Sequence, residues 1–146
     1  AKQAIPVRTF VLCGREATVV RYKQWPGLGA SNYQPTDYEI GMEKISKGDY
    51  AGALEVLERF LDSNPDSHEA LVGMAICHAH LGRMEQALRM IDRALGLTDR
   101  DPMIYEIQGD ILSSLGRANE ARSAWRRALK LNPNSRKLRA KIARGR

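Results

Sequence analysis

The sequence predicts an all-α fold, an array of three helical hairpins that is preceded by a short β-ribbon. The main observation is a repeat of 34 residues, which is clearest in three glycines, Gly48, Gly82 and Gly116. An alanine follows each glycine five residues later, at Ala53, Ala87 and Ala121. A period of this length is typical of helical repeat arrays, in which each repeat buries its apolar face against its neighbours.

Residues 1–33 do not follow the repeat and predict a β-ribbon and a linker. Residues 7–12 and 17–22 are rich in β-branched and aromatic side chains, and the segment between them suits a hairpin loop. A Trp-Pro-Gly-Leu-Gly stretch at residues 25–29 predicts the linker. Because an isolated hairpin is marginally stable in water, we expect this ribbon to cover part of the helices, to cap the first repeat, or to be exchanged with a second copy in a homodimer.

The repeat region divides into three hairpins, residues 34–67, 68–101 and 102–135, with two helices in each. The predicted helices are 36–47, 50–62, 67–80, 84–95, 102–115 and 118–130. The three repeat glycines suit the positive φ that follows a helix, and Pro65 and Pro133 stop the second helices of their hairpins. The recurring alanines allow the two helices of a hairpin to approach closely.

Residues 136–146 predict a basic capping helix and tail. Leu138 and Ile142 form an apolar stripe, and the segment carries six Lys and Arg residues and no acid. The last hairpin of an array needs such a cap, because no further repeat covers its outer face.

The third repeat carries the most complete motif, with Tyr105, Gly109, Gly116, Ala121, Trp125, Ala128 and Pro133 at fixed spacing. With these residues at these spacings, the chain resembles the tetratricopeptide repeat family over residues 34–135. The resemblance implies a right-handed superhelical array. The sequence departs from the family pattern at Asp37, Lys44, His78 and Asp99, which weakens individual repeats and leaves the spacing intact.

In this family the first helices of the repeats line a concave groove, so the resemblance places a partner-binding surface there. The residues expected to face it are Tyr38, Met42, Ile45, Ser46, Val72, Ile76, Ala79, His80, Met103, Glu106, Asp110, Ser113 and Ser114. This surface is apolar at one end and acidic at the other, which suits a segment of another protein with two or three apolar anchors. We therefore expect a protein interaction scaffold or adaptor. The alternative is that some of these side chains pack between helices or under the ribbon.

The charge distribution suggests a rival function. Residues 1–33 carry five Lys and Arg against one acid, residues 34–135 carry twelve against sixteen, and residues 136–146 carry six against none. A basic C-terminal third can bind nucleic acid or an anionic membrane. That third lacks interleaved exposed aromatics that would stack on bases, so the scaffold is the favoured interpretation.

No motif in the sequence indicates an enzyme, a cofactor or a metal. Cys77 and His80 stand three positions apart, but no second cluster supplies the other ligands of a tetrahedral site. No apolar run approaches the roughly 18 residues of a membrane span. The two cysteines show no disulfide framework, so we expect a cytoplasmic protein, although a removed leader before Ala1 would also fit.

Overall fold

The computed structural model describes residues 5–12, 15–21 and 34–144. The chain forms two compact units, Ala1–Gln34 and Pro35–Arg146, which we describe separately. In the first unit, β1 (Ile5–Leu12) pairs with β2 (Arg15–Arg21) in an antiparallel ribbon. The register places Leu12 opposite Arg15 and shifts between Pro6 and Arg8. The predicted ribbon is therefore present. The predicted linker at residues 25–29 lies outside the described residues.

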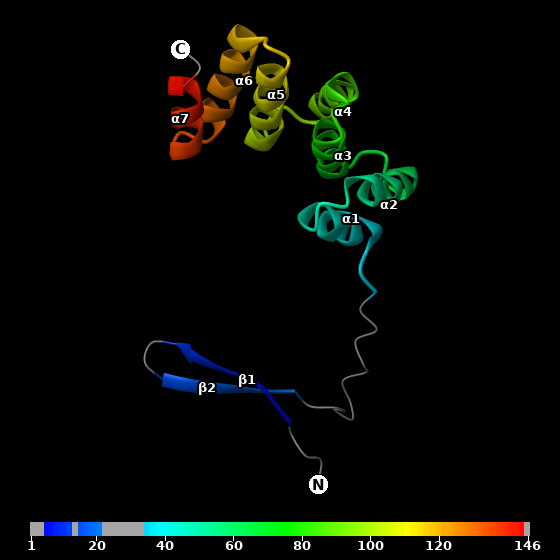
Figure 1. Ribbon diagram of the computed structural model, residues 1–146, viewed down its shortest axis with the longest axis vertical. Helices are drawn as coiled ribbons and strands as arrows, with labels where there is room; N and C mark the ends of the chain where they lie inside the picture. Colours follow the sequence, from blue (N-terminus) through cyan, green and yellow to red (C-terminus); the bar gives the residue numbers. More distant parts are fainter. Residues whose placement is uncertain (1–4, 13–14, 22–33, 145–146) are drawn as a thin grey trace. The chain divides into compact units, whose positions relative to one another are not determined.

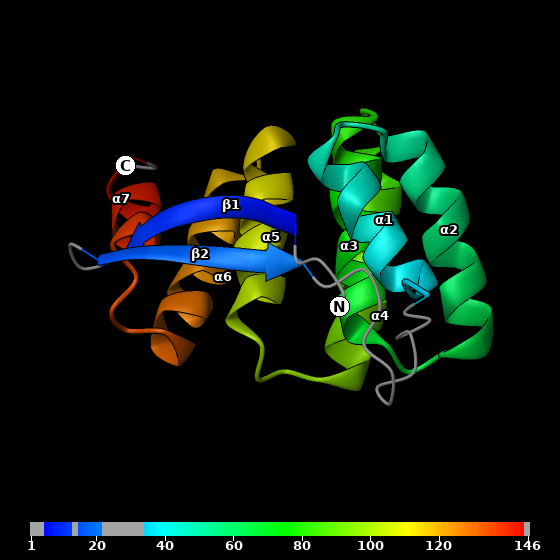
Figure 2. The same ribbon diagram turned by 90° about the horizontal axis from the view of Figure 1, so that it is seen from below.

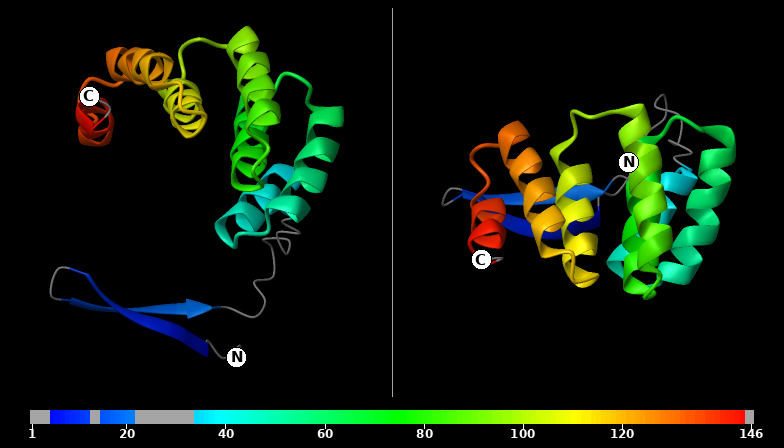
Figure 3. Two further views of the ribbon diagram at one scale, coloured as in Figure 1. Left: turned by 45° about the horizontal axis from the view of Figure 1, so that its top comes forward. Right: turned by 90° about the horizontal axis from the view of Figure 1, so that it is seen from above.

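The second unit consists of helices in the described part of the chain (Figure 1). Their bounds are α1 (Asp37–Ser46), α2 (Tyr50–Ser63), α3 (His68–His80), α4 (Met84–Leu97), α5 (Pro102–Ser114), α6 (Ala118–Leu131) and α7 (Arg136–Arg144). All six predicted hairpin helices are confirmed to within two residues at each end. The predicted capping helix is α7, which packs on α6 at the C-terminal end of the array (Figure 3).

Local capping chemistry explains where the helices begin and end. At the start of α1, the Thr36 hydroxyl accepts a hydrogen bond from the Glu39 N–H at 3.2 Å, and the Glu39 carboxylate accepts one from the Thr36 N–H at 2.8 Å. This reciprocal pair satisfies two N–H groups that the helix leaves free. The first helix of each hairpin ends before a glycine with positive φ, at Gly48, Gly82 and Gly116. The predicted left-handed conformation is thus confirmed at all three turns.

The helices form two rows within this unit. The two helices of each hairpin lie side by side (Figure 2). The first helices also contact one another, α1 with α3 and α3 with α5. Figure 1 shows α1, α3 and α5 on the inner side of the arc, which we call the inner row, and α2, α4 and α6 on the outer side, which we call the outer row.

Two apolar clusters form the core of the helical unit. The first extends from α2 to α5 and contains fully buried side chains such as Leu57 and Ile91. The second joins α5, α6 and α7 through Leu112, Trp125 and Leu138. Leu88 packs against both clusters. The repeat alanines have no exposed surface, as predicted, at Ala53, Ala87, Ala121 and Ala128.

Glycines in the inner row allow the helices to approach closely. A Cβ atom on Gly109 would collide with the indole of Trp125, and one on Gly41 would collide with the side chain of Leu57. Any larger residue at these positions would push the two helices of the hairpin apart. The glycines therefore set the close spacing of the first and third hairpins.

Candidate functional site

A pocket of about 150 Å³ opens between α3 and α5 on the inner row. Its walls are largely apolar, and three of the lining residues are polar, His80, Asp110 and Ser114. The full set of lining residues is Ile76, Ala79, His80, Met84, Ile107, Asp110, Ile111 and Ser114. Space of this size suits one aliphatic or aromatic side chain, because apolar cavities of similar volume hold small hydrophobic molecules.

Five residues of the predicted groove meet in this pocket: Ile76, Ala79, His80, Asp110 and Ser114. The ring of His80 stacks on the ring of Tyr50 from α2, with centroids 4.3 Å apart and an interplanar angle of 3°. The Ser114 hydroxyl donates to the Asp110 carbonyl at 3.1 Å. His80 and Ser114 are thus held in place by contacts with Tyr50 and with the Asp110 carbonyl.

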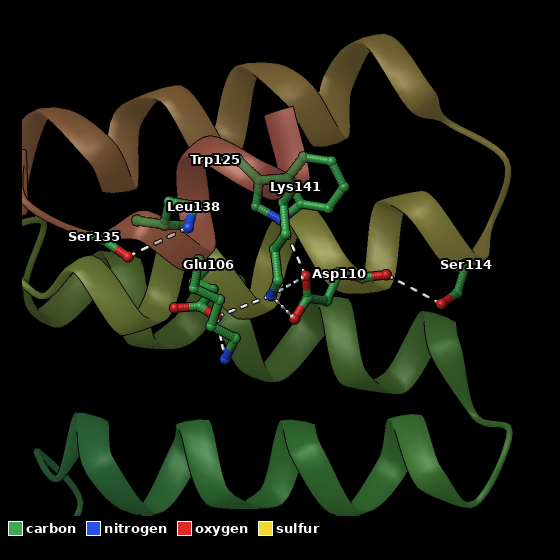
Figure 4. A network of polar contacts seen from close by, with 8 residues as sticks. Glu106, Asp110, Ser114, Trp125, Ser135, Leu138 and Lys141 are labelled. Carbon is green, nitrogen blue, oxygen red and sulfur yellow. Dashed lines mark hydrogen bonds and ion pairs between the residues drawn. The ribbon is translucent and has the colours of Figure 1, made fainter. Parts of the chain in front are cut away.

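The capping helix reaches into the end of the groove that the sequence predicts to be acidic (Figure 4). Lys141 Nζ lies 2.7 Å from both carboxylate oxygens of Asp110 and 2.9 Å from Glu106 Oε1. Lys137 Nζ lies 2.7 Å from the same Glu106 oxygen. Two lysines therefore neutralise the two carboxylates at the end of the groove that the sequence predicts to be acidic. Spacing within α5 could not show this, because the partners come from a helix about 30 residues further along the chain.

The ion pairs shift the pKa values of Glu106 and Lys141. Burial alone would raise the pKa of Glu106, but hydrogen bonds from Lys137 and Lys141 outweigh it, so the net pKa is lowered. Burial alone would lower the pKa of Lys141, but hydrogen bonds to Asp110 and Glu106 outweigh it, so the net pKa is raised. Both groups therefore stay charged in the folded protein across the neutral pH range.

Trp125 connects this ion-pair cluster to the core. Its indole N–H donates to Asp110 Oδ1 at 3.0 Å, while the ring fills the space beside Gly109. Asp110 therefore receives hydrogen bonds from α6 and from α7 at once. The carboxylate is oriented by two helices outside the inner row, which fixes one edge of the pocket.

The other predicted groove residues lie in different surroundings. Tyr38 packs against Phe60 of α2, with ring centroids 5.6 Å apart. Met42 and Ile45 lie over Gly73 at the contact of α1 with α3. Val72 is only 3% exposed and belongs to the first apolar cluster, so it offers no surface to a ligand. Met103 is 55% exposed and does not line the pocket.

Sequence reasoning missed three pocket residues, Met84, Ile107 and Ile111. Ile107 and Ile111 stand four positions apart, and Ser114 follows three positions later, so they share one face of α5. This 3.6-residue pattern was a usable signal. Met84 opens α4, and only the close return of the chain after Gly82 brings it beside α3.

Two groups can be distinguished among the basic residues of the C-terminal third. Lys137 and Lys141 pair with acids, and Arg117 pairs with Glu120 at 2.6 Å. A second group is exposed and forms no ion pair within the part of the chain that the structure describes: Arg126, Arg127, Lys130, Arg136 and Arg144. Trp125 is buried and hydrogen-bonded, so it cannot stack on a nucleic-acid base.

Cys77 is a buried free thiol in the first apolar cluster. Burial raises its pKa to about 11, which keeps it protonated and a poor metal ligand at neutral pH. Among the residues described by the structure, no group of three or more His, Cys, Asp or Glu side chains is arranged to hold a metal. Within the same residues, no helix combines the length and the apolar character that crossing a membrane requires.

Comparison with protein families finds the same kind of repeat in two parts of the helical unit. Models described as tetratricopeptide repeat match residues 44–111 and 102–135. Together the two matches cover more than half of the chain, and they include every residue that lines the pocket between α3 and α5.

Similar proteins include relatives of very different length. Tetratricopeptide repeat protein 13 of Homo sapiens is 26% identical over 137 residues, which cover 90% of this chain and 16% of that protein. Photosystem I assembly protein Ycf3 of Prochlorococcus marinus (strain NATL1A) is 32% identical over 113 residues, which cover 66% of this chain and 65% of that protein. The chain therefore spans less than two thirds of the length of either relative.

A solved structure agrees with the fold. The first tetratricopeptide repeat domain of Spaghetti (RPAP3), bound to the HSP90 peptide SRMEEVD, superposes with a TM-score of 0.71 and 20% sequence identity. The superposition covers 75% of this chain and 86% of that chain. Identity at this level shows a common arrangement of the helices.

Proposed function

This chain belongs to the tetratricopeptide repeat family, and from that premise we propose that it binds a segment of a partner protein on its inner row. The observation that carries the proposal is the apolar pocket between α3 and α5, which has room for one large side chain of the partner. The solved relative with the same arrangement of helices holds a peptide.

The chemistry of the inner row defines the kind of segment. Ile76, Ile107 and Ile111 offer apolar contacts, and His80, Asp110 and Ser114 offer hydrogen-bonding groups at the rim. Because Lys137 and Lys141 neutralise the carboxylates nearby, a strongly basic ligand gains little there. The segment therefore carries a large apolar anchor and little net charge.

The proposal includes binding without chemical turnover. The polar residues of the pocket contain one histidine, and its ring is stacked on Tyr50. Ser114 and His80 both line the pocket, but the Ser114 hydroxyl donates to the Asp110 carbonyl. Within the described residues, no hydrogen bond joins the serine to the histidine as in the nucleophile–base pair of covalent catalysis. We place the chain in the cytoplasm in keeping with the free thiol of Cys77.

Selection from a displayed library of random peptides tests the proposal directly. The immobilised chain should enrich peptides that share one large apolar residue. Fluorescence polarisation then compares the affinity of these peptides for the wild-type chain and for Ser114→Trp, whose indole would fill the pocket. We expect the variant to bind at least about tenfold more weakly, the loss that follows when an anchor is excluded.

Ser113→Trp is the matched control. Ser113 is the exposed neighbour of Ser114 and does not line the pocket, so this variant should bind like the wild type. Affinity should also change little with salt, because the groove is close to neutral. Peptides that lack an apolar consensus, or that bind Ser114→Trp as tightly as the wild type, would refute the proposal.

A further inference from the structure

Asp110 lines the pocket between α3 and α5 and keeps an unused hydrogen-bonding position on its carboxylate (Figure 4). Oδ1 accepts from the Trp125 indole at 3.0 Å and from Lys141 Nζ at 2.7 Å, while Oδ2 accepts from Lys141 Nζ at 2.7 Å. A carboxylate offers about four acceptor positions, so one position on Oδ2 is unused within the described part of the chain. The side chain of Asp110 is 45% exposed, so a ligand can reach it.

The donors that surround Asp110 have partners already. An ammonium group has three N–H donors, and Lys141 directs its own to both oxygens of Asp110 and to Glu106. The indole N–H of Trp125 is taken by Asp110, and the Ser114 hydroxyl donates to the Asp110 carbonyl. Ser114 then offers a ligand only the lone pairs of its oxygen. Asp110 and Ser114 therefore present acceptors, and a ligand group that can only accept would stay unpaired beside them.

We propose that the partner segment of the proposed function, on which this inference rests, carries a tyrosine as its anchor. The pocket of about 150 Å³ is close in size to cavities that hold a single benzene ring. Ile76, Ile107 and Ile111 provide the apolar wall for the ring of the tyrosine. Its hydroxyl donates to the unused position of Asp110, so Asp110 selects tyrosine over phenylalanine and over aliphatic side chains.

A tyrosine matches the polar end of the pocket better than the other side chains that carry a donor. His80, which also lines the pocket and stacks on Tyr50, has one donor and one acceptor when its ring is neutral. A phenol oxygen can accept from this donor while its proton goes to Asp110, whereas the N–H of a tryptophan can only donate. A lysine of the partner would meet the positive charge of Lys141 at Asp110 and would bring no ring to the isoleucines.

Titration of the full chain with side-chain analogues tests the pocket itself. The probes are para-cresol for tyrosine, toluene for phenylalanine and methylindole for tryptophan, and amide chemical shifts of the isotope-labelled chain report binding. Para-cresol should shift the amides of Ile107, Ile111 and Ser114. It should bind about tenfold more tightly than either other probe, because only its hydroxyl both donates and accepts. Toluene or methylindole that binds as tightly as para-cresol would overturn the inference, and this comparison needs no variant.

The variant Asp110→Asn assigns the preference to one side chain. Its amide nitrogen turns an acceptor into a donor, so para-cresol and toluene should bind within about twofold of each other. Glu106→Gln is the matched control, because Glu106 pairs with the same Lys141 but does not line the pocket. This variant should keep the preference for para-cresol. A preference that survives Asp110→Asn, or that Glu106→Gln removes equally, would show that Asp110 does not select the anchor.

Peptides selected on the immobilised chain carry the same test to a whole segment. Their shared large residue should be tyrosine, and its replacement by phenylalanine or by para-fluorophenylalanine, which keep the ring and lose the donor, should weaken binding by about tenfold. A consensus of leucine or phenylalanine would overturn this inference and leave the proposed function intact. A selection without any consensus would count against the proposed function, whereas the analogue titration decides on the tyrosine pocket separately.

Discussion

At the scale of single residues, two glycines within helices have different surroundings. Gly109 lies in α5 against the indole of Trp125, so that an added Cβ would collide with the ring. Gly96 lies in α4 with open space where a Cβ would stand. The recurring spacing of the family motif includes Gly109, and the contact with Trp125 supplies its physical reason.

Alanine substitution at these two positions gives the first prediction. Gly109→Ala should lower the free energy of unfolding by about 1–3 kcal/mol, because the ring and the helix must move apart. Gly96→Ala should raise it by up to about 1 kcal/mol, because alanine favours the helix more than glycine does. Urea unfolding followed by circular dichroism measures both. Equal effects of the two substitutions would show that the Gly109 contact is unimportant.

Residue identity alone predicts the packing glycines and alanines but not every groove position. Tyr38, Val72 and Glu106 are equivalent in the repeat, and the sequence places all three in the groove. Val72 is buried, because α3 has α1 on one side and α5 on the other. Position within a repeat fixes the direction of a side chain, whereas its burial depends on how many helices flank the helix that carries it.

At the scale of helices, the attachment of α7 is the feature that the sequence only half predicts. The apolar stripe indicated a cap, and Leu138 is indeed 1% exposed. The role of Lys141 was not visible, because its partners lie on α5, which is not adjacent to α7 in the chain. By contrast, glycine and proline signals, which are local, placed the helix ends of the hairpins to within two residues.

Replacement of Lys141 by methionine gives the second prediction. The side chain of Lys141 is 20% exposed and forms ion pairs with the carboxylates of Glu106 and Asp110. Lys141→Met should therefore lower the free energy of unfolding by about 1–3 kcal/mol. Lys137→Met is the control. Its side chain is 70% exposed, and its loss should cost less than about 1 kcal/mol. A larger effect at Lys137 than at Lys141 would contradict the assignment.

The effect of Lys141→Met should depend on pH at both extremes. The pKa of Glu106 is lowered by folding, so its contribution is present above its ordinary value of 4.5 and is lost as the pH falls through the lowered value. The pKa of Lys141 is raised, so its contribution is present below 10.5 and is lost as the pH rises through the raised value. The difference in unfolding free energy between wild type and variant should therefore be largest between pH 4.5 and 10.5, and a constant difference down to about pH 2 would exclude the ion pairs as its source.

At the scale of the whole molecule, the ribbon of β1 and β2 gives the third prediction. Two strands alone are marginally stable, and we expect residues 5–23 to cover part of the helical array or to be exchanged between copies. Deletion of residues 1–30 from the otherwise unchanged chain distinguishes the two.

Light scattering and peptide affinity report the outcome of this deletion. A dimer that becomes a monomer supports exchange through the ribbon. An unchanged mass with a higher affinity for a selected groove peptide supports masking within one chain. If the mass, the affinity and the melting temperature all stay the same, the ribbon is a passive extension and the prediction is wrong.

The division of the core into two apolar clusters has a consequence for local unfolding. Helices α6 and α7 belong mainly to the second cluster, whereas Ile76, Ile107 and Ile111 of the pocket pack with the first. Repeat arrays open from their ends in cooperative steps, so amide hydrogens of α6 and α7 should exchange with deuterium together and sooner than those of α3 and α4. Each such opening would release Glu106 and Asp110 from Lys141 and Asp110 from Trp125. The groove would then briefly carry two negative charges that it lacks in the closed state, and the edge of the pocket that Asp110 forms would be less fixed.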